Sequence, residues 1–274
     1  MLKWYIQNAY EPYRSEIEYF AKCSDLPVGA IVTVNLVYDL TAMCTSIVAE
    51  DGNGNIIHGR NLDYGGMPLL RNSTFVGNFV NNNGDVLYRG TSFFGYAGLW
   101  TGIKPGYFSV SGDERFNSSL VDNILGIHDD FYPPSWLMRD AVSQDTSFDE
   151  AKERLISTKV MAPVYFILGG KQYPDGCVIT RNSTYSYQLF DLKTSYLNWY
   201  VLETNYDWWM PPPKKDDRRD PAIQAMNAVG QNNINQDTLF NVLSTPPVLN
   251  DGTLYTTIFS AANQSMYYTM IRFP

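Results

Sequence analysis

Cys44, Arg60 and Asp63 are residue types that could support nucleophilic chemistry together. Cys44 opens the short run 44–47, and Arg60 and Asp63 lie in the next extended run, 58–64. Asp-Gly and Asn-Gly pairs between the two runs favour a tight reversal of the chain. A hairpin at this point would return the guanidinium and the carboxylate to the side of the Cys44 thiol.

A thiol becomes a nucleophile when a base or a cation lies close to it. The chain has two histidines, His58 and His128, so there are few candidates for the base of a Cys-His pair. We interpret His58 as a structural strand residue and His128 as a loop residue. The alternative base is the amine that Cys44 would gain if the Met43–Cys44 bond were cut, because a chain that begins at its nucleophile carries its own proton acceptor.

The composition bounds the class of protein. With 274 residues, 45% of them hydrophobic, the chain can bury one large core or a core plus a small helical annex, so one catalytic domain is expected. A net charge of −8 leaves no positive field for phosphate backbones, which argues against nucleic-acid binding. The same charge suits either ordinary solubility or work at low pH, where protonation reduces carboxylate repulsion.

The cysteines do not form a scaffold or a metal motif. Cys23, Cys44 and Cys177 are too few for a disulfide framework, and none has Cys-x-x-Cys spacing. A Cys23–Cys177 bond and two free thiols remain equal alternatives, and no cofactor or metal is predicted. The chain has no apolar run long enough for a membrane span, and residues 1–5 lack the pattern of a signal peptide. Four Asn-x-Ser/Thr sites permit glycosylation without requiring it, at Asn72, Asn117, Asn182 and Asn263.

The hydrophobic periodicity predicts the elements that must position Cys44. A helix is expected over 12–23, stopped by 26–29, and a strand over 31–40 leads to a further strand that begins at Cys44. A β-meander follows to Val110, with turns at 51–52, 83–84 and 105–106, and then two or three helices within 120–158, the last capped by Ser147. Further strands are expected at 164–168, 177–180, 199–202, 254–259 and 267–272, and helices at 222–229 and 236–243. Blocks of strands and helices without strict βαβ alternation indicate an α+β protein with helices covering sheets.

Several segments of the chain resemble one enzyme family. The run C-T-S-I-V-A-E-D…H-G-R-N-L-D-Y, which starts at Cys44, resembles the start of the catalytic β-subunit of the acid ceramidase and N-acylethanolamine-hydrolysing acid amidase family, which are N-terminal-nucleophile hydrolases. The likeness continues to the C-terminus through F-G-Y-A-G-L-W-T-G (94–102), S-G-D-E-R-F (111–116), A-P-V-Y-F-I-L-G-G (162–170), V-I-T-R-N (178–182), E-T-N-Y-D (203–207), D-D-R-R (216–219) and L-Y-T-T (254–257).

The resemblance implies a fold and a maturation step. The expected fold is a four-layer αββα sandwich, with residues 1–43 as a partial α-subunit or propeptide segment and residues 44–274 as the catalytic β-subunit. The family's precursors begin with a secretion signal and a longer α-segment than residues 1–43 supply. Cys44 would attack the carbonyl of Met43, cut the precursor and gain its free amine as general base. Arg60 would favour the thiolate, and Asp63 would hold the new amine.

Three further site residues follow from the resemblance. Asn205 matches a position that supplies an amide donor to the oxyanion, Glu114 an acidic residue that assists processing, and Arg218 a site arginine. Without the resemblance, Asn205 would be interpreted as a turn residue, Glu114 as a helix or turn carboxylate and Arg218 as part of a solvated charge run.

A set of aromatic side chains is open to two interpretations, an acyl-chain channel or plain core: Phe93, Phe94, Trp100 and Trp136.

The substrate expected by resemblance is a lipid N-acyl amide. The runs 98–102, 110–115 and 227–231 are more similar to the N-acylethanolamine branch, whereas Ala162-Pro163 and Asn182 are more similar to the ceramidase branch. N-acylethanolamine is therefore the first expectation. Ceramide, or a lipid-binding relative that never cleaves itself, is the alternative. The family also implies a lysosomal location, two subunits from one precursor, and a contact with a membrane surface or a lipid activator.

Overall fold

Two antiparallel sheets stacked face to face form the centre of the molecule. The computed structural model describes residues 11–38, 43–65, 69–115, 132–183 and 186–273. One sheet has the order β10-β1-β2-β11-β12, from β1 (Met43–Glu50), β2 (Ile56–Asp63), β10 (Tyr200–Glu203), β11 (Thr253–Phe259) and β12 (Tyr267–Ile271). The other runs from β3 to β9 in chain order, with β3 (Thr74–Val80), β4 (Val86–Phe93), β5 (Thr101–Lys104), β6 (Phe108–Glu114), β7 (Val164–Gly169), β8 (Gly176–Arg181) and β9 (Ser186–Asp191).

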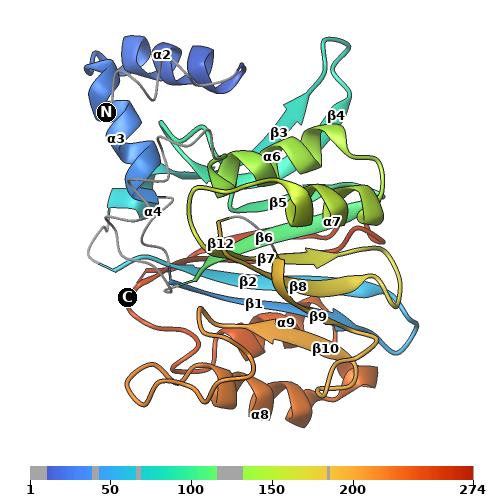
Figure 1. The fold of residues 1–274 in the computed structure, drawn as a ribbon. Helices are drawn as coiled ribbons and strands as arrows, with labels where there is room; N and C mark the ends of the chain where they lie inside the picture. The colour runs from blue at the N-terminus through green and yellow to red at the C-terminus, as the bar shows by residue number, and fades with distance from the viewer. Residues whose placement is uncertain (1–10, 39–42, 66–68, 116–131, 184–185, 274) are drawn as a thin grey trace.

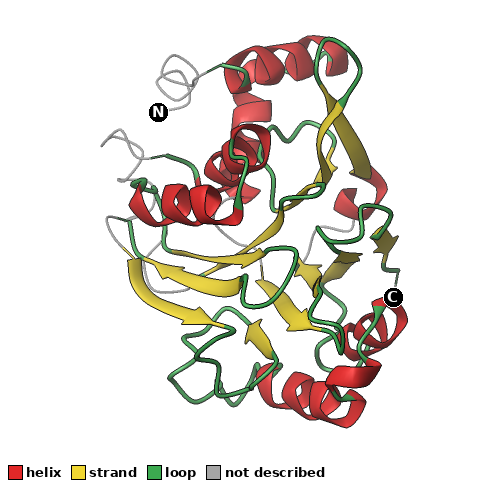
Figure 2. Cartoon of the chain, turned by 90° about the vertical axis from the view of Figure 1, so that its right-hand side faces the viewer, coloured by secondary structure: helices red, strands yellow, loops and turns green. Residues whose placement is uncertain are grey.

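Helices cover the outer face of each sheet, and the sheets touch each other through β1 and β6. The helices α6 (Pro134–Gln144) and α7 (Phe148–Ser157) lie on the seven-stranded sheet, and α8 (Arg219–Val229) and α9 (Gln236–Leu243) lie on the five-stranded sheet (Figure 1). Figure 2 shows the helices above and below the stacked strands. The predicted αββα sandwich is confirmed.

Local signals in the sequence explain where the covering helices begin. Ser147 precedes α7 and its side chain accepts a hydrogen bond from the Glu150 amide, as the sequence predicts. Asn235 precedes α9, and its side chain and that of Thr238 satisfy each other's backbone amides in a capping box. The predicted helix around 121–125 lies outside the described residues.

The N-terminal helices correct one prediction. The helix predicted over 12–23 is α2 (Tyr13–Ser24). The strand prediction over 31–40 is wrong for residues 31–38, which belong to α3 (Val28–Tyr38), and its last two residues lie outside the described part of the chain. Tertiary contacts override the β-propensity of this valine-rich segment. The Asn35 amide donates to Ile31 O and to Gly95 O, and its oxygen accepts from Ala97 N, so the helix is fixed to the loop after β4. A short helix that the sequence did not predict, α4 (Leu69–Ser73), precedes β3.

The predicted hairpin between β1 and β2 is confirmed. Its turn is closed by the Asp51 amide on Asn55 O, and Gly54 takes a φ of 83°, a conformation that glycine adopts without strain. The pairing register puts Met43 opposite Asp63 and Ser46 opposite Arg60. Because side chains alternate along a strand, Cys44, Ser46 and Arg60 point to the same face, toward the second sheet.

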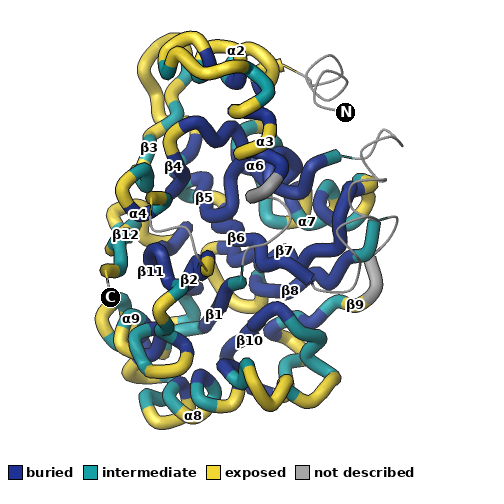
Figure 3. Tube along the Cα trace, turned by 90° about the vertical axis from the view of Figure 1, so that its left-hand side faces the viewer, coloured by how far each residue is buried: buried dark blue, intermediate teal, exposed yellow. Residues whose placement is uncertain are grey.

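The buried core fills the space between the layers. In Figure 3 the strands β6, β7 and β8 are buried, whereas α2 is largely exposed. Cys177 is buried on β8, Cys23 is exposed on α2, and both are free thiols, so the structure favours the unbridged alternative. Among the described residues no helix is both long and apolar enough to cross a membrane.

Candidate active site

The Cys44 sulfur lies directly against a guanidinium. Arg60 Nη2 donates to Cys44 Sγ at 2.5 Å, and both residues are fully buried between the sheets. The same guanidinium donates to Trp100 O at 2.7 Å, Thr101 Oγ1 at 2.8 Å and Gly112 O at 3.0 Å. Fixed main-chain carbonyls therefore orient the cation toward the sulfur, as the hairpin prediction required.

Burial and charge act in opposite directions on the Cys44 thiol. Burial raises its pKa, while the positive charges of Arg60 and Arg218 lower it and the carboxylates of Asp113 and Asp63 raise it further. The net direction is upward, so burial outweighs the two guanidinium groups in its effect on the thiol pKa. Any change that removes negative charge from this site favours the thiolate.

A second cluster holds the main chain of Cys44. Its amide donates to Asn205 Oδ1 at 2.6 Å, and Arg218 Nη1 donates to its carbonyl at 2.5 Å. Arg218 Nη2 also donates to Asn205 Oδ1 at 3.0 Å, and Asn205 Nδ2 donates to the main-chain carbonyl of Glu114 at 2.8 Å. Asn205 has a φ of 70°, a left-handed conformation that is uncommon outside glycine and that clusters at functional sites.

Asp63 lies beside the bond that would be cut, because the hairpin register puts it opposite Met43. Its Oδ2 accepts from Asn250 Nδ2 at 3.0 Å and from Arg218 Nη1 at 3.4 Å. Burial raises the pKa of this carboxyl, and the positive charge of Arg218 opposes that effect. Arg218 is in turn held by Asp216, whose two oxygens accept from Nε at 2.7 Å and Nη2 at 3.0 Å.

The structure brings together five of the six predicted site residues through their side chains: Cys44, Arg60, Asp63, Asn205 and Arg218. Glu114 reaches this group through its main-chain carbonyl, and its side chain is nearly buried. Arg218 is 2% exposed, so it is not the solvated charge that composition alone suggested.

Two residues at the site were missed by the sequence interpretation, the buried Asp113 and the half-buried Asn250. Asp113 Oδ1 lies 3.5 Å from Arg60 Nη2. A signal for Asp113 was present, because Ser109, Ser111 and Asp113 alternate with other residues in a strand that is otherwise buried. Three polar side chains on one face of a buried strand indicate a polar partner on the facing sheet.

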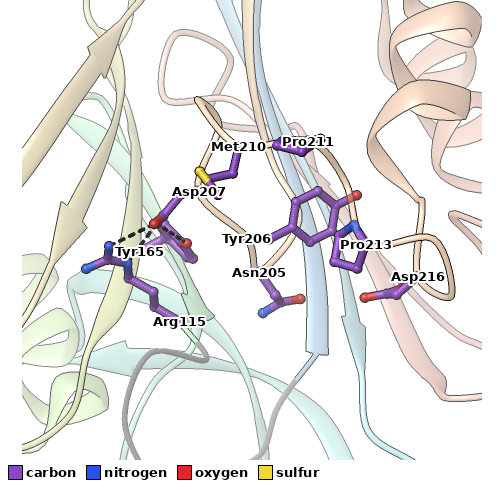
Figure 4. A pocket seen from close by; sticks show the side chains of 9 residues that line it. All are labelled: Arg115, Tyr165, Asn205, Tyr206, Asp207, Met210, Pro211, Pro213 and Asp216. Atoms are coloured by element: carbon purple, nitrogen blue, oxygen red, sulfur yellow. Dashed lines mark hydrogen bonds and ion pairs between the residues drawn. The ribbon is translucent and has the colours of Figure 1, made fainter.

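A pocket of about 320 Å³ opens beside Asn205. Figure 4 shows Asn205 and Tyr206 on one wall, and Arg115 and Asp207 joined across another. Arg115 donates to the two Asp207 oxygens at 2.8 and 2.9 Å, and Tyr165 OH donates to Asp207 Oδ1 at 2.7 Å. Through Asn205 and Asp216, this pocket reaches the residues around Cys44.

The aromatic side chains considered for a channel have other positions. Phe93, Trp100 and Trp136 are core residues. Phe94 is 59% exposed, with its ring 5.5 Å from that of Phe20. None of the four lines the pocket beside Asn205. Within the part of the chain that the structure describes, no group of three or more His, Cys, Asp or Glu side chains is placed to hold a metal ion.

A cysteine near the start of an inner strand, with a guanidinium on its sulfur inside an αββα sandwich, defines a cysteine hydrolase of the N-terminal-nucleophile fold. Residues 44–230 match the family described as linear amide C–N hydrolases, choloylglycine hydrolase family, and the chain belongs to that family. It is therefore a hydrolase of linear amide bonds.

Named relatives fall into the two branches that the motifs suggested. The chain is 44% identical over 265 residues to the N-acylethanolamine-hydrolyzing acid amidase of Mus musculus, and that alignment covers 96% of this chain and 73% of the relative. It is 41% identical over 279 residues to the acid ceramidase of Pan troglodytes, and that alignment covers 95% of this chain and 70% of the relative. The solved structure of the Caenorhabditis elegans N-acylethanolamine-hydrolyzing acid amidase ortholog superposes with a TM-score of 0.75 at 35% identity, covering 84% of this chain and all of that one.

Proposed function

We propose that the protein is an acid amidase that hydrolyses N-acylethanolamines to a fatty acid and ethanolamine through a Cys44 acyl-thioester. The observation that carries the proposal is the 2.5 Å contact between Arg60 Nη2 and Cys44 Sγ, which provides a counter-charge for a thiolate. The choice of substrate is supported by the relatives named for that activity, which are the more similar of the two branches.

The proposed maturation step cuts the Met43–Cys44 bond. The sulfur attacks the Met43 carbonyl carbon, the C–N bond breaks as the nitrogen takes up a proton, and water then hydrolyses the resulting thioester. Support comes from the hydrogen bonds that fix the main chain of Cys44. Asn205 Oδ1 accepts from its amide, and Arg218 Nη1 donates to its carbonyl. We assign to Asp63, which lies opposite Met43, the role of holding the new amine.

In turnover, the thiolate attacks the amide carbonyl of the lipid, ethanolamine leaves, and water activated by the Cys44 α-amine releases the fatty acid. A free α-amine ordinarily has a pKa of about 7.7–8.0, so at acidic pH it begins as the protonated partner of a thiolate. Asn205 lines the pocket and carries the amide donor that we assign to the oxyanion. Glu114, whose carbonyl positions that amide, is assigned to processing.

Residues 1–43 would remain attached after cleavage as a small α-subunit. The Tyr13 ring stacks on Trp136 at 4.2 Å, and Arg139 donates to both oxygens of Glu16 at 2.5 and 2.6 Å. These contacts support a non-covalent association of α2 with α6, without a disulfide. Residues 44–274 would form the catalytic subunit.

A lysosomal location and glycosylation belong to the same proposal. They are supported by the acid amidase and acid ceramidase relatives and by two sequons whose asparagines are exposed, Asn72 and Asn263. A contact with a membrane surface or a lipid activator would deliver the substrate. The Asn117 sequon lies outside the described residues.

The test begins with purified full-length protein held at about pH 5 and analysed by intact mass and N-terminal sequencing. We expect a fragment that begins at Cys44. Palmitoylethanolamide and a ceramide are then compared as substrates for the parent, Cys44→Ala and Cys177→Ala, since Cys177 is equally buried but lies on β8. Faster hydrolysis of the ethanolamide, lost only in Cys44→Ala, supports the proposal. Faster hydrolysis of the ceramide would instead indicate a ceramidase. Lipid binding without self-cleavage or turnover would refute the proposal that the protein is an enzyme of this type.

A further inference from the structure

A continuous row of buried polar groups leads away from the Cys44 site between the two sheets. It begins at the Gly169 carbonyl, which accepts from Ser109 Oγ at 3.1 Å. The His58 ring follows, with Nδ1 3.0 Å from Ser109 Oγ and Nε2 2.9 Å from Ser111 Oγ. His58 is fully buried and stacks on Phe259 at 4.4 Å.

The second half of the row ends at the guanidinium that holds the nucleophile. Ser111 Oγ donates to Ser46 Oγ at 2.9 Å, and Ser46 Oγ donates to Asp113 Oδ1 at 2.8 Å. Asp113 Oδ1 lies 3.5 Å from Arg60 Nη2, the atom that donates to Cys44 Sγ. The row therefore connects His58 to the charge balance of the nucleophile.

Counting protons shows that this row is one proton short in its ordinary charge state. Five contacts in a row need five protons, while three serine hydroxyls and a neutral imidazole supply four. The Gly169 carbonyl can only accept, so Ser109 gives it its proton and Nδ1–H donates to Ser109. Ser111 gives its proton to Ser46, so His58 Nε2 would also have to donate, which makes the ring an imidazolium.

Two arrangements supply the fifth proton. In one, His58 is an imidazolium and Asp113 is ionised. In the other, Asp113 is protonated and donates to Ser46, Ser46 donates to Ser111, and Ser111 donates to Nε2 of a neutral ring. The two differ by one proton that moves along the row through both hydroxyls, and no atom is lost or gained.

We propose that Asp113 is a positioning residue of this enzyme that shares a single proton with His58 through Ser46 and Ser111, and that uptake of this proton activates Cys44 in acid. The proposal rests on the proposed function and deepens it, because it gives the same site its pH dependence. Wherever the proton resides, it makes the surroundings of Cys44 one charge more positive, which favours the thiolate.

The burial of these groups agrees with this role. Burial raises the pKa of Asp113 to about 6, against the effect of Arg60. Burial also lowers the pKa of His58 well below its usual value, so burial opposes the charged form of both groups. The ionisable or charged groups that face Asp113 come from four other segments, namely Cys44, Arg60, Asp63, Glu203 and Arg218. Of these, Glu203 is a buried carboxyl, and its burial raises its pKa well above the usual value.

The test compares Cys44 reactivity across pH in matched variants. Alkylation of Cys44 by iodoacetamide, followed by mass spectrometry, and kcat/KM are measured between about pH 5 and 7.5. If Asp113 loses its proton with a midpoint near pH 6, the alkylation rate of Asp113→Asn divided by that of the parent should rise about thirtyfold across that range. The reason is that the asparagine cannot lose the proton. Glu203→Gln removes another buried carboxyl that is outside the row, and its ratio to the parent should stay flat.

Two serine variants on β6 test whether the proton is shared. Ser111→Ala breaks the row between His58 and Asp113, so the midpoint should move. Ser109→Ala removes a matched hydroxyl on the other side of the ring, where Nδ1–H donates in both arrangements, so the midpoint should not move.

A direct readout comes from the ring nitrogens of the two histidines in full-length protein labelled with ¹⁵N-histidine, assigned with His128→Gln. The His58 Nε2 resonance should shift with the midpoint of Cys44 reactivity in the parent and lose that shift in Ser111→Ala. A flat ratio for Asp113→Asn, equal midpoints for the two serine variants, or a His58 resonance that ignores pH would each overturn the proposal. Reactive Cys44 with this pH dependence but no lipid hydrolysis would instead refute the proposed function alone.

Discussion

Replacing Arg60 tests how the site creates a nucleophile. Arg60→Gln removes the charge that lies 2.5 Å from the Cys44 sulfur in a fully buried site. Two unit charges about 4 Å apart at an effective dielectric constant of about 20 interact by about 4 kcal/mol, equivalent to about three pKa units. Because Arg218 also lowers the thiol pKa and remains in place, we expect a loss of about 10²–10³ in kcat/KM.

The same substitution should also cost stability, and the two effects can be separated. Without Arg60, the Asp113 carboxylate is buried without its cation, which costs on the order of 3–5 kcal/mol. In Arg60→Gln/Asp113→Asn that carboxylate is absent, so unfolding by urea should return toward the parent midpoint. Reactivity of Cys44 should stay low, because the guanidinium is still missing.

The assay is the pH dependence of Cys44 alkylation together with kcat/KM for palmitoylethanolamide. Arg60→Lys keeps the charge but has three donors for the five acceptors around the guanidinium, so its kcat/KM should fall between those of the parent and Arg60→Gln. Arg139→Gln removes another buried arginine away from the sulfur and serves as the control. If Arg60→Gln keeps kcat/KM within about tenfold of the parent and leaves the pH midpoint of Cys44 alkylation unchanged, the Arg60 guanidinium is not what makes Cys44 a nucleophile.

Three further substitutions give independent checks. Asn205→Ala should lower kcat by about 10²–10³, because it removes the proposed oxyanion donor. It should also destabilise the fold by about 1 kcal/mol more than Asn205→Gly in urea unfolding, because glycine adopts a φ of 70° without strain. Equal unfolding midpoints for the two variants would contradict this. Glu16→Gln weakens the two hydrogen bonds from Arg139 and should reduce the free energy that holds the N-terminal segment on the cleaved protein by about 1–2 kcal/mol. In gel filtration the segment should therefore dissociate at a lower urea concentration. An elution profile equal to the parent's would argue against docking through this pair. Gly59→Ala would put a methyl 2.8 Å from Leu239 Cδ2 and should lower the unfolding free energy by about 1–3 kcal/mol; a thermal transition equal to the parent's would show that α9 can move aside.

The elements nearest the nucleophile were the easiest to predict from the sequence. The β1–β2 hairpin follows from local turn chemistry, and its register puts Arg60 opposite Ser46, on the same face of the sheet as Cys44. The prediction over 31–40 failed because its valines suggest a strand, whereas the contacts that decide the conformation come from Gly95 and Ala97, about 60 residues away.

The distant parts of the site could not be derived from local patterns. Arg218 and Asn205 contact Cys44 across more than 150 residues of chain, so their positions depend on how β10 and the start of α8 meet β1. The resemblance supplied their roles without their contacts. Asp113 was visible as an alternating polar residue, but its meaning needed the facing strand.

If Cys44 acts with its own free amine, active protein must carry an N-terminal cysteine. Active protein is treated with a reagent that couples only to an N-terminal cysteine, which carries an amine and a thiol on adjacent carbons, and the modified site and residual turnover are measured on the same sample. We expect a label on Cys44 of the fragment 44–274 and loss of turnover in proportion to labelling. Full turnover by protein in which Met43 is still joined to Cys44, with no label, would contradict it.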